Sequence, residues 1–120
     1  MSLPTFGFVA VQQAPLADGV ASEALWCAQV ADTGWPTARL WRQQQALVVP
    51  KSYERRPQWA EACAASAAAG WPVQVRSSGG GLVPQGPGVW NLSLVWPAPA
   101  AMPTDTGVIY SALTDELRAA

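Results

Sequence analysis

The sequence predicts an α+β fold (a mixed α/β sandwich) built as a single domain. Three segments carry apolar residues at helical spacing, and four short apolar runs between them are typical of β-strands. The elements follow one another in the order α-β-β-α-β-loop-β-α, an order that favours packed layers of helix and sheet. At 120 residues the chain holds one domain at most and is long enough to bury a core.

Residues 18–32, DGVASEALWCAQVAD, are predicted to form the first helix. Asp18 or Ser22 is suited to cap its start, and Gly34 follows its end. The apolar stripe that we expect to face the core comprises Val20, Ala24, Leu25, Ala28 and Ala31. Two short strands are then expected at residues 38–43 and 46–53, with the turn 42–45 between them. Their core-facing side chains should be Leu40, Leu47 and Val49.

Residues 57–70, PQWAEACAASAAAG, predict the second helix. Pro57 suits its first turn because the missing N–H would be unpaired there, and Gly70 is a typical stop. The side facing the sheet should carry Trp59, Ala62, Cys63 and Ala67. Ser66 shares that side, and its hydroxyl is expected to bond the carbonyl one turn back. The many small residues imply close packing against a sheet.

Residues 71–77 are predicted to return as a third strand, and residues 89–97 form a fourth with alternating character. The strongly apolar face of the fourth strand comprises Trp90, Leu92, Leu94 and Trp96. A proline-rich linker, 98–107, leads to a final helix at residues 106–120. The apolar residues of that helix are Val108, Ala112, Leu113 and Leu117. It runs to the last residue without a stop signal, so we expect the domain to be incomplete.

Composition excludes several classes of function. Seven basic and eight acidic residues give a net charge of -1, so nucleic acid is not expected as a partner. Histidine is absent, and no metal site is expected. Cys27 and Cys63 are predicted to be reduced and buried. The sequence has no signal-peptide pattern and no apolar run of about 18 residues, so a cytoplasmic location without a membrane partner is expected.

The most informative segment is QVRSSGGGLVPQGPG, residues 74–88, which contains Gly79–Gly81. Glycines tolerate positive φ and lack Cβ, so their N–H groups can surround an anion. Arg76 could add a bidentate clamp, and Ser77 and Ser78 could donate hydroxyls. No Gly-Lys-Ser/Thr ends the loop and a strand follows it, so it is neither a P-loop nor a dinucleotide fingerprint. From spacing alone, a structural turn and an anion site both stay open.

The segment RSSGGGLV, followed by Gly88 and the strand WNLSLV, resembles the signature loop of the lipoate–protein ligase A family within the biotin/lipoate A/B protein ligases. The resemblance extends over roughly residues 20–119. It implies a mixed, mainly antiparallel sheet flanked by helices, of the class II aminoacyl-tRNA synthetase/biotin-ligase-like type. It also implies a long pocket for a lipoyl or octanoyl chain and its adenylate.

The resemblance assigns substrate and adenylate binding to Arg76, Ser78, Gly79, Gly80, Gly81, Val83, Gln85 and Gly88. The chain departs from the family pattern at Val75, where an arginine is typical, and at Gln85 and Gly86, where a His-acidic pair is typical. Lys51 lies on the wrong side of the loop to match the essential lysine of the family. No catalytic residue is therefore assigned, and the 120 residues alone are not expected to catalyse lipoylation.

The resemblance implies a ligase that uses ATP with magnesium and transfers a lipoyl or octanoyl group to a lysine of a carrier domain. The QGPG segment is closer to the His-Gly-Pro-Gly of octanoyltransferases, which work without ATP; a non-catalytic binding module is a further alternative. Arg55 and Arg56 are either solvated or contact an acidic carrier domain. Trp41 or Trp90 could line an acyl channel.

Overall fold

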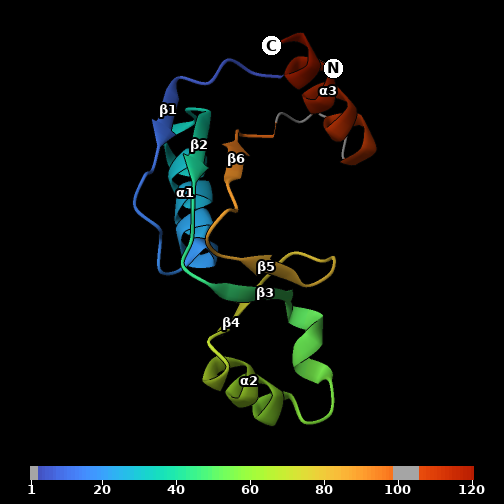
Figure 1. The fold of residues 1–120 in the computed structure, drawn as a ribbon. Helices are drawn as coiled ribbons and strands as arrows, with labels where there is room; N and C mark the ends of the chain where they lie inside the picture. The colour runs from blue at the N-terminus through green and yellow to red at the C-terminus, as the bar shows by residue number, and fades with distance from the viewer. Residues whose placement is uncertain (1–2, 99–105) are drawn as a thin grey trace.

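The structure is a computed structural model of residues 1–120 and describes residues 3–98 and 106–120. The α+β class is confirmed, because α-helices and mixed β-sheets make up the described chain (Figure 1). In chain order the elements are β1 (Phe8–Val11), α1 (Gly19–Thr33), β2 (Thr37–Trp41), β3 (Ala46–Pro50), the 3-10 helix η1 (Lys51–Arg55), α2 (Trp59–Ala68), β4 (Val73–Arg76), β5 (Val83–Gln85), β6 (Asn91–Val95) and α3 (Thr106–Ala119).

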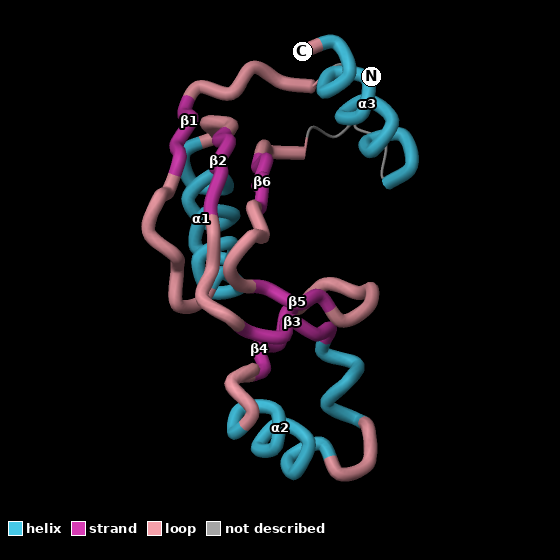
Figure 2. The backbone as a smooth tube through the Cα atoms, in the orientation of Figure 1, coloured by secondary structure: helices cyan, strands magenta, loops and turns pink. Residues whose placement is uncertain are grey.

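The strands form two three-stranded sheets, both mixed. In the first sheet, β1-β2-β6, β1 runs parallel and β6 antiparallel to β2. In the second, β4-β3-β5, β4 runs parallel and β5 antiparallel to β3. A mixed sheet was expected, but antiparallel pairing does not predominate. The chain passes between the sheets twice, from β2 to β3 and from β5 to β6 (Figure 2).

The predicted helices and strands are all present, but the sequence pattern missed β1 and β5. β5 spans only three residues and contains Pro84, which is depleted in strands. The expected strand 46–53 ends at Pro50 and continues as η1. The prediction that Pro57 opens the second helix is wrong, because α2 starts after an N-cap at Gln58 with a φ of 59°.

The ends of α1 follow the local signals, whereas its buried face does not. Asp18 accepts a hydrogen bond from the backbone N–H of Ala21 at 3.0 Å, and Gly34 adopts a φ of 72° at the C-terminal end. The predicted apolar stripe is wrong, since the buried residues of α1 are Gly19, Trp26 and Val30. The alanines are apolar but small. The large ring of Trp26 and the bare backbone of Gly19 decide which face meets the sheet.

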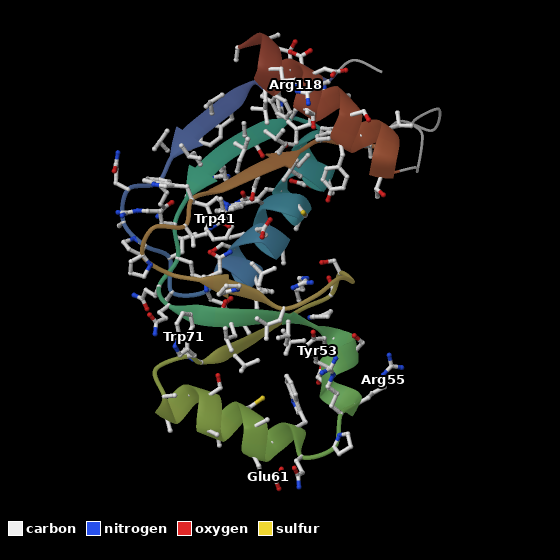
Figure 3. The ribbon with its side chains drawn as sticks, turned by 45° about the vertical axis from the view of Figure 1, so that its right-hand side comes forward. Trp41, Tyr53, Arg55, Glu61, Trp71 and Arg118 are labelled. Atoms are coloured by element: carbon white, nitrogen blue, oxygen red, sulfur yellow. The ribbon has the colours of Figure 1, made fainter. Side chains whose placement is uncertain are left out.

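Trp41 is the centre of the contact between α1 and the first sheet (Figure 3). Its side chain is 3% exposed, and its ring meets that of Trp26 edge-on, with centroids 5.7 Å apart. Trp41 Nε1 donates to Ser93 Oγ at 2.8 Å, and Ser93 Oγ donates to Glu23 Oε2 at 3.1 Å. A Cβ built on Gly19 would lie 2.4 Å from the Trp41 ring. Trp41 therefore fits only against a glycine at the start of α1.

Gly19→Ala should lower the free energy of unfolding by about 1–3 kcal/mol, because the added methyl overpacks the Trp41 ring. Urea unfolding of the purified variant measures this change. The matched control is Gly81→Ala, where a Cβ has no neighbour within 4 Å and should change stability by less than about 0.5 kcal/mol. Equal effects of the two substitutions would contradict the packing described for Gly19.

The opposite face of the first sheet is apolar and largely open to solvent. The strand registers place six apolar residues on it: Val9, Val11, Ala38, Leu40, Leu92 and Leu94. Leu92 is 49% exposed, and Leu40 and Trp90 are also exposed. The prediction that Leu40 faces the core is therefore wrong, and on the apolar side of β6 Leu92 is exposed while Leu94 is half-buried. α1 covers the face that carries Trp41 and Ser93, so these apolar side chains point the other way.

α2 lies beside the second sheet (Figure 1), but none of its residues is fully buried. Trp59, Cys63 and Ser66 are half-buried, whereas the predicted contact residues Ala62 and Ala67 are exposed. In β3, Val49 is buried as predicted and Leu47 is half-buried. A cavity of about 240 Å³ lies between α2, η1 and the sheet, lined in part by Leu47, Val49, Trp59, Cys63, Val73 and Leu82.

Ser66 does not bond the carbonyl one turn back, as its spacing predicted. Its Oγ donates forward to the carbonyl oxygen of Trp71 at 2.5 Å, tying the end of α2 to the start of the returning strand. In α3, Ala112 and Leu113 of the predicted apolar stripe are half-buried together with Ile109, whereas Val108 and Leu117 are exposed. Most of the predicted linker lies outside the described residues. None of the described helices is long and apolar enough to cross a membrane.

Candidate functional site

Arg76 organises the glycine loop that connects β4 and β5. Its Nη2 donates to the carbonyl oxygens of Gly79 and Gly81, at 2.9 and 2.7 Å. Its Nη1 donates to the carbonyl oxygen of Val48 on the neighbouring strand, at 3.3 Å. Two hydrogen bonds thus hold the loop against the guanidinium, and the third ties it to β3; a guanidinium has five N–H donors in all. The sequence pattern predicted Arg76 as a clamp for a ligand; in the structure its guanidinium donates to carbonyl oxygens of the chain itself.

The loop leaves a run of backbone donors free. The carbonyl groups of Gly79 and Gly81 face Arg76, whereas the N–H groups of Gly79, Gly80 and Gly81 have no acceptor among the described residues. Gly80 has a φ of 110°, a conformation that other residues rarely adopt. The loop is thus a tight turn at Gly80 that also presents free N–H donors. The structure therefore contains the turn, and the anion site stays a prediction with which the free N–H groups are compatible.

The other residues assigned by resemblance follow the loop in order. Ser78 is exposed in the loop, and Val83 lies on β5, half open to solvent. Gln85 ends β5 and is buried. Gly88, with a φ of 89°, lies in the turn between β5 and β6. The structure therefore places Ser78 and the three glycines in one loop that starts from Arg76 at the end of β4, whereas Val83 and Gln85 lie on β5 and Gly88 in the turn to β6.

Gln85 pairs with a residue that the sequence pattern did not single out, Asn91. Gln85 Nε2 donates to Asn91 Oδ1 at 2.9 Å, and Asn91 Nδ2 donates to Gln85 Oε1 at 3.0 Å. Gln85 is only 8% exposed, so this reciprocal amide pair satisfies it away from water. The pair links the last residue of β5 to the first of β6 and thereby joins the two sheets. The pair is uncharged, and its first member stands where the sequence resemblance expects a titratable histidine.

Removing either amide should cost stability because its partner is left unpaired. We expect Asn91→Ala and Gln85→Ala each to lower the free energy of unfolding by about 1–3 kcal/mol. The double variant should cost less than the sum of the two by about 1 kcal/mol, which a double-mutant cycle in urea measures. Strictly additive losses would show that the two amides do not interact in solution.

The two tryptophans considered for an acyl channel lie in different surroundings. Trp41 is enclosed between α1 and the first sheet. Trp90 is half exposed, and the guanidinium of Arg42 stacks on its ring at 4.9 Å. Arg42 also donates from Nη2 to the carbonyl oxygen of Gln13. Trp90 and Arg42 therefore form a partly open, positively charged surface beside the turn that contains Gly88.

Apolar space adjoins the loop. Leu82, directly after Gly81, lines the cavity beneath α2. A second, more open pocket of about 450 Å³ lies beside β6 and is lined in part by Glu23, Cys27, Leu94, Trp96 and Ile109.

The two cysteines are free thiols in different surroundings. Cys27 is exposed, so the prediction that both cysteines are buried is wrong for it, whereas Cys63 is half-buried. No group of three or more His, Cys, Asp or Glu that could hold a metal occurs among residues 3–98 and 106–120.

Comparison with known proteins identifies relatives of this chain. The family model described as "Lipoyl protein ligase A/B catalytic domain" matches residues 16–118. An uncharacterized protein of Cupriavidus necator is 49% identical over 67 residues, which are 56% of this chain and 26% of that protein. The octanoyl-[GcvH]:protein N-octanoyltransferase of Kyrpidia tusciae is 36% identical over 95 residues, covering 78% of this chain and 33% of that protein.

Solved structures with the same fold come from Thermoplasma acidophilum. A bi-partite lipoate protein ligase, studied with its E2 lipoyl domain, superimposes with a TM-score of 0.64 at 19% identity, over 96% of this chain and 46% of that one. Protein Ta0514 with bound lipoic acid gives a TM-score of 0.61 at 18% identity, over 89% of this chain and 43% of that one. The chain thus spans less than half of these structures and about a quarter to a third of the curated relatives.

Proposed function

The chain belongs to the lipoyl protein ligase A/B catalytic domain family, and from this premise we propose that it binds a lipoyl or octanoyl group at the glycine loop for transfer to a lysine of a carrier domain. The transfer activity is proposed and not inherited from the relatives, because the chain spans only about a quarter to a third of their length. Within that activity, these 120 residues supply the binding loop, and the resemblance assigns them no transfer lysine.

The free N–H groups of Gly79, Gly80 and Gly81 carry the proposal. Such donors match the oxygens of an acyl carboxylate or of the phosphate of an acyl adenylate. A hydrogen bond from a backbone N–H to an anion contributes about 1.5–3 kcal/mol where water is excluded. Arg76 keeps the competing carbonyl groups of Gly79 and Gly81 turned toward itself. Its positive charge also favours an anion beside the loop.

In the ligase version of this function, the acyl carboxylate attacks the α-phosphorus of ATP and pyrophosphate leaves. The mixed anhydride then gives its acyl group to a carrier lysine, releasing AMP. The loop donors would hold the phosphate and carboxyl oxygens during both steps. Magnesium would accompany ATP, as the resemblance implies, and no residue of this chain is assigned to hold it.

A second candidate is an octanoyltransferase that needs no ATP. Two observations favour it: the QGPG segment resembles the His-Gly-Pro-Gly of octanoyltransferases, and the relative from Kyrpidia tusciae is named as an octanoyltransferase. In this version the loop binds the acyl carbonyl rather than a phosphate. A non-catalytic relative would bind the acyl group and transfer nothing.

Calorimetric titration with octanoate, lipoate and ATP tests the proposal. We expect octanoate or lipoate to bind, and octanol, which has the same chain without the carboxylate, to give no heat. Binding of ATP in addition would favour the ligase over the octanoyltransferase. The proposal fails if neither acid gives heat, or if octanol binds as well as octanoate. Acyl transfer is tested separately, with a carrier domain, octanoyl-acyl carrier protein or octanoate plus ATP as the donor, and mass spectrometry as the readout. We expect no transfer by these 120 residues, to which no transfer lysine is assigned, and transfer would show that the chain is itself catalytic.

A further inference from the structure

Three exposed basic residues lie beside the glycine loop and form what we call the basic edge: Lys51, Arg55 and Arg56. Lys51 and Arg55 are the first and last residues of η1, and Arg56 follows directly. Pro50, the residue before Lys51, pairs with Arg76 in the register between β3 and β4. The basic edge therefore begins next to the residue from which the loop starts.

The views of the fold agree with this placement. The segment connecting β4 and β5 lies beside η1 in Figure 1 and again in Figure 3, after the molecule is turned. Arg55 points outward from η1 in Figure 3. A protein that approaches the loop from this side would therefore meet the basic edge first.

Charge is unevenly distributed along the chain. Between residues 51 and 76 there are four basic and two acidic residues, whereas the rest of the chain has three basic and six acidic residues. The segment around the loop thus carries a net charge of +2, and the remainder carries -3. An acidic partner is attracted to the loop region and repelled elsewhere, so its orientation is selected by charge.

The fold itself makes little use of these charges. Among the described residues, Lys51, Arg55 and Arg56 form no ion pair. The guanidinium of Arg56 stacks on the ring of Tyr53, 3.9 Å from its centroid, which holds it at the surface. Tyr53 in turn lines the cavity beneath α2. The three positive charges therefore remain available to an anionic partner, and Glu54, which is also exposed on η1, offsets one of them.

We propose that the basic edge docks an acidic surface of the carrier domain whose lysine receives the acyl group. This inference rests on the proposed function, because that function requires a carrier lysine to reach the glycine loop. The edge orients the carrier so that its lysine faces the loop. Exposed charges of this kind mainly affect the association rate and orientation, and their effect is reduced by salt.

Charge reversal at Arg55 tests the docking surface. We expect Arg55→Glu to raise the Kd for a purified apo lipoyl domain of net negative charge by about three- to tenfold at low salt. The double variant Lys51→Glu/Arg55→Glu should raise it further. The matched control is Arg118→Glu, the same charge change on α3 at the opposite end of the molecule (Figure 3), which should stay within about twofold.

Binding should also weaken as ionic strength rises from about 0.01 to about 0.15 M, since the Debye length falls from about 30 to about 8 Å. Equal effects of Arg55→Glu and Arg118→Glu, salt-independent binding or no binding by the wild-type chain would each overturn the inference. Octanoate titration without the carrier keeps the two proposals apart. If the Arg55→Glu variant binds octanoate normally and binds the carrier as tightly as wild type does, only the docking surface is contradicted. If the wild-type chain does not bind octanoate, the proposed function is contradicted.

Discussion

Trp41→Ala should lower the free energy of unfolding by about 3–5 kcal/mol, the range measured for truncation of buried large aromatic residues. Trp41 is 3% exposed and packs edge-on against Trp26. Its loss leaves a cavity between α1 and the first sheet. It also removes the hydrogen bond that Trp41 Nε1 donates to Ser93 Oγ. Because a domain of this size is stable by about 5–15 kcal/mol in total, a large part of that stability would be lost.

Urea unfolding followed by circular dichroism measures this loss. Trp35→Ala is the matched control, since it removes the same side chain where it is 66% exposed. We expect the control to change stability by less than about 1 kcal/mol. If both variants lost a similar amount of stability, the contact between Trp41 and α1 would not be central to the packing of the first sheet.

Arg76→Lys should weaken octanoate binding by about tenfold or more, although it keeps the positive charge. Lysine cannot reproduce the planar fork that reaches the carbonyl oxygens of Gly79, Gly81 and Val48 together. Without it, the carbonyl groups of Gly79 and Gly81 are no longer held toward Arg76 and are free to turn toward the ligand. A loss of about 1.4 kcal/mol in binding, less than one charge-assisted hydrogen bond, already corresponds to tenfold.

Calorimetry of the Arg76→Lys protein with octanoate checks this expectation. Arg118→Lys serves as the control, because it makes the same change at an exposed position on α3. An Arg76→Lys protein that binds octanoate as wild type does would show that charge alone, and not the geometry of the guanidinium, prepares the loop. Thermal unfolding of the same samples verifies that the variants are folded.

Local signals in the sequence predicted the ends of α1 and the position of the loop. Asp18 and Gly34 act through their own backbone and side-chain chemistry, which needs no tertiary contact. The buried face of α1 was not predictable in that way. It depends on Gly19 and Trp26 meeting Trp41, a residue that lies on another element.

The candidate site was also predictable only in part, since its local contacts follow from the sequence and its loop geometry does not. The proximity of Arg76 to the glycines follows from three residues of separation, so the sequence pattern found it. The direction of the carbonyl groups is set by the backbone of the folded loop, and composition carries no signal for it. The pairing of Gln85 with Asn91 needs the turn between them, which brings two amides six residues apart into reciprocal contact. The spacing across the QGPG turn was the one available hint.

The open face of the first sheet affects how stability depends on temperature. Half of the residues are apolar, yet Val9, Val11, Leu40 and Leu92 are in contact with water in the folded chain. Apolar surface that is already hydrated in the folded state adds nothing to the heat-capacity increase of unfolding. That increase sets how strongly the free energy of unfolding curves with temperature. The chain therefore has a flatter stability curve than its composition suggests, with weaker cold destabilisation and a broad temperature range of nearly constant stability.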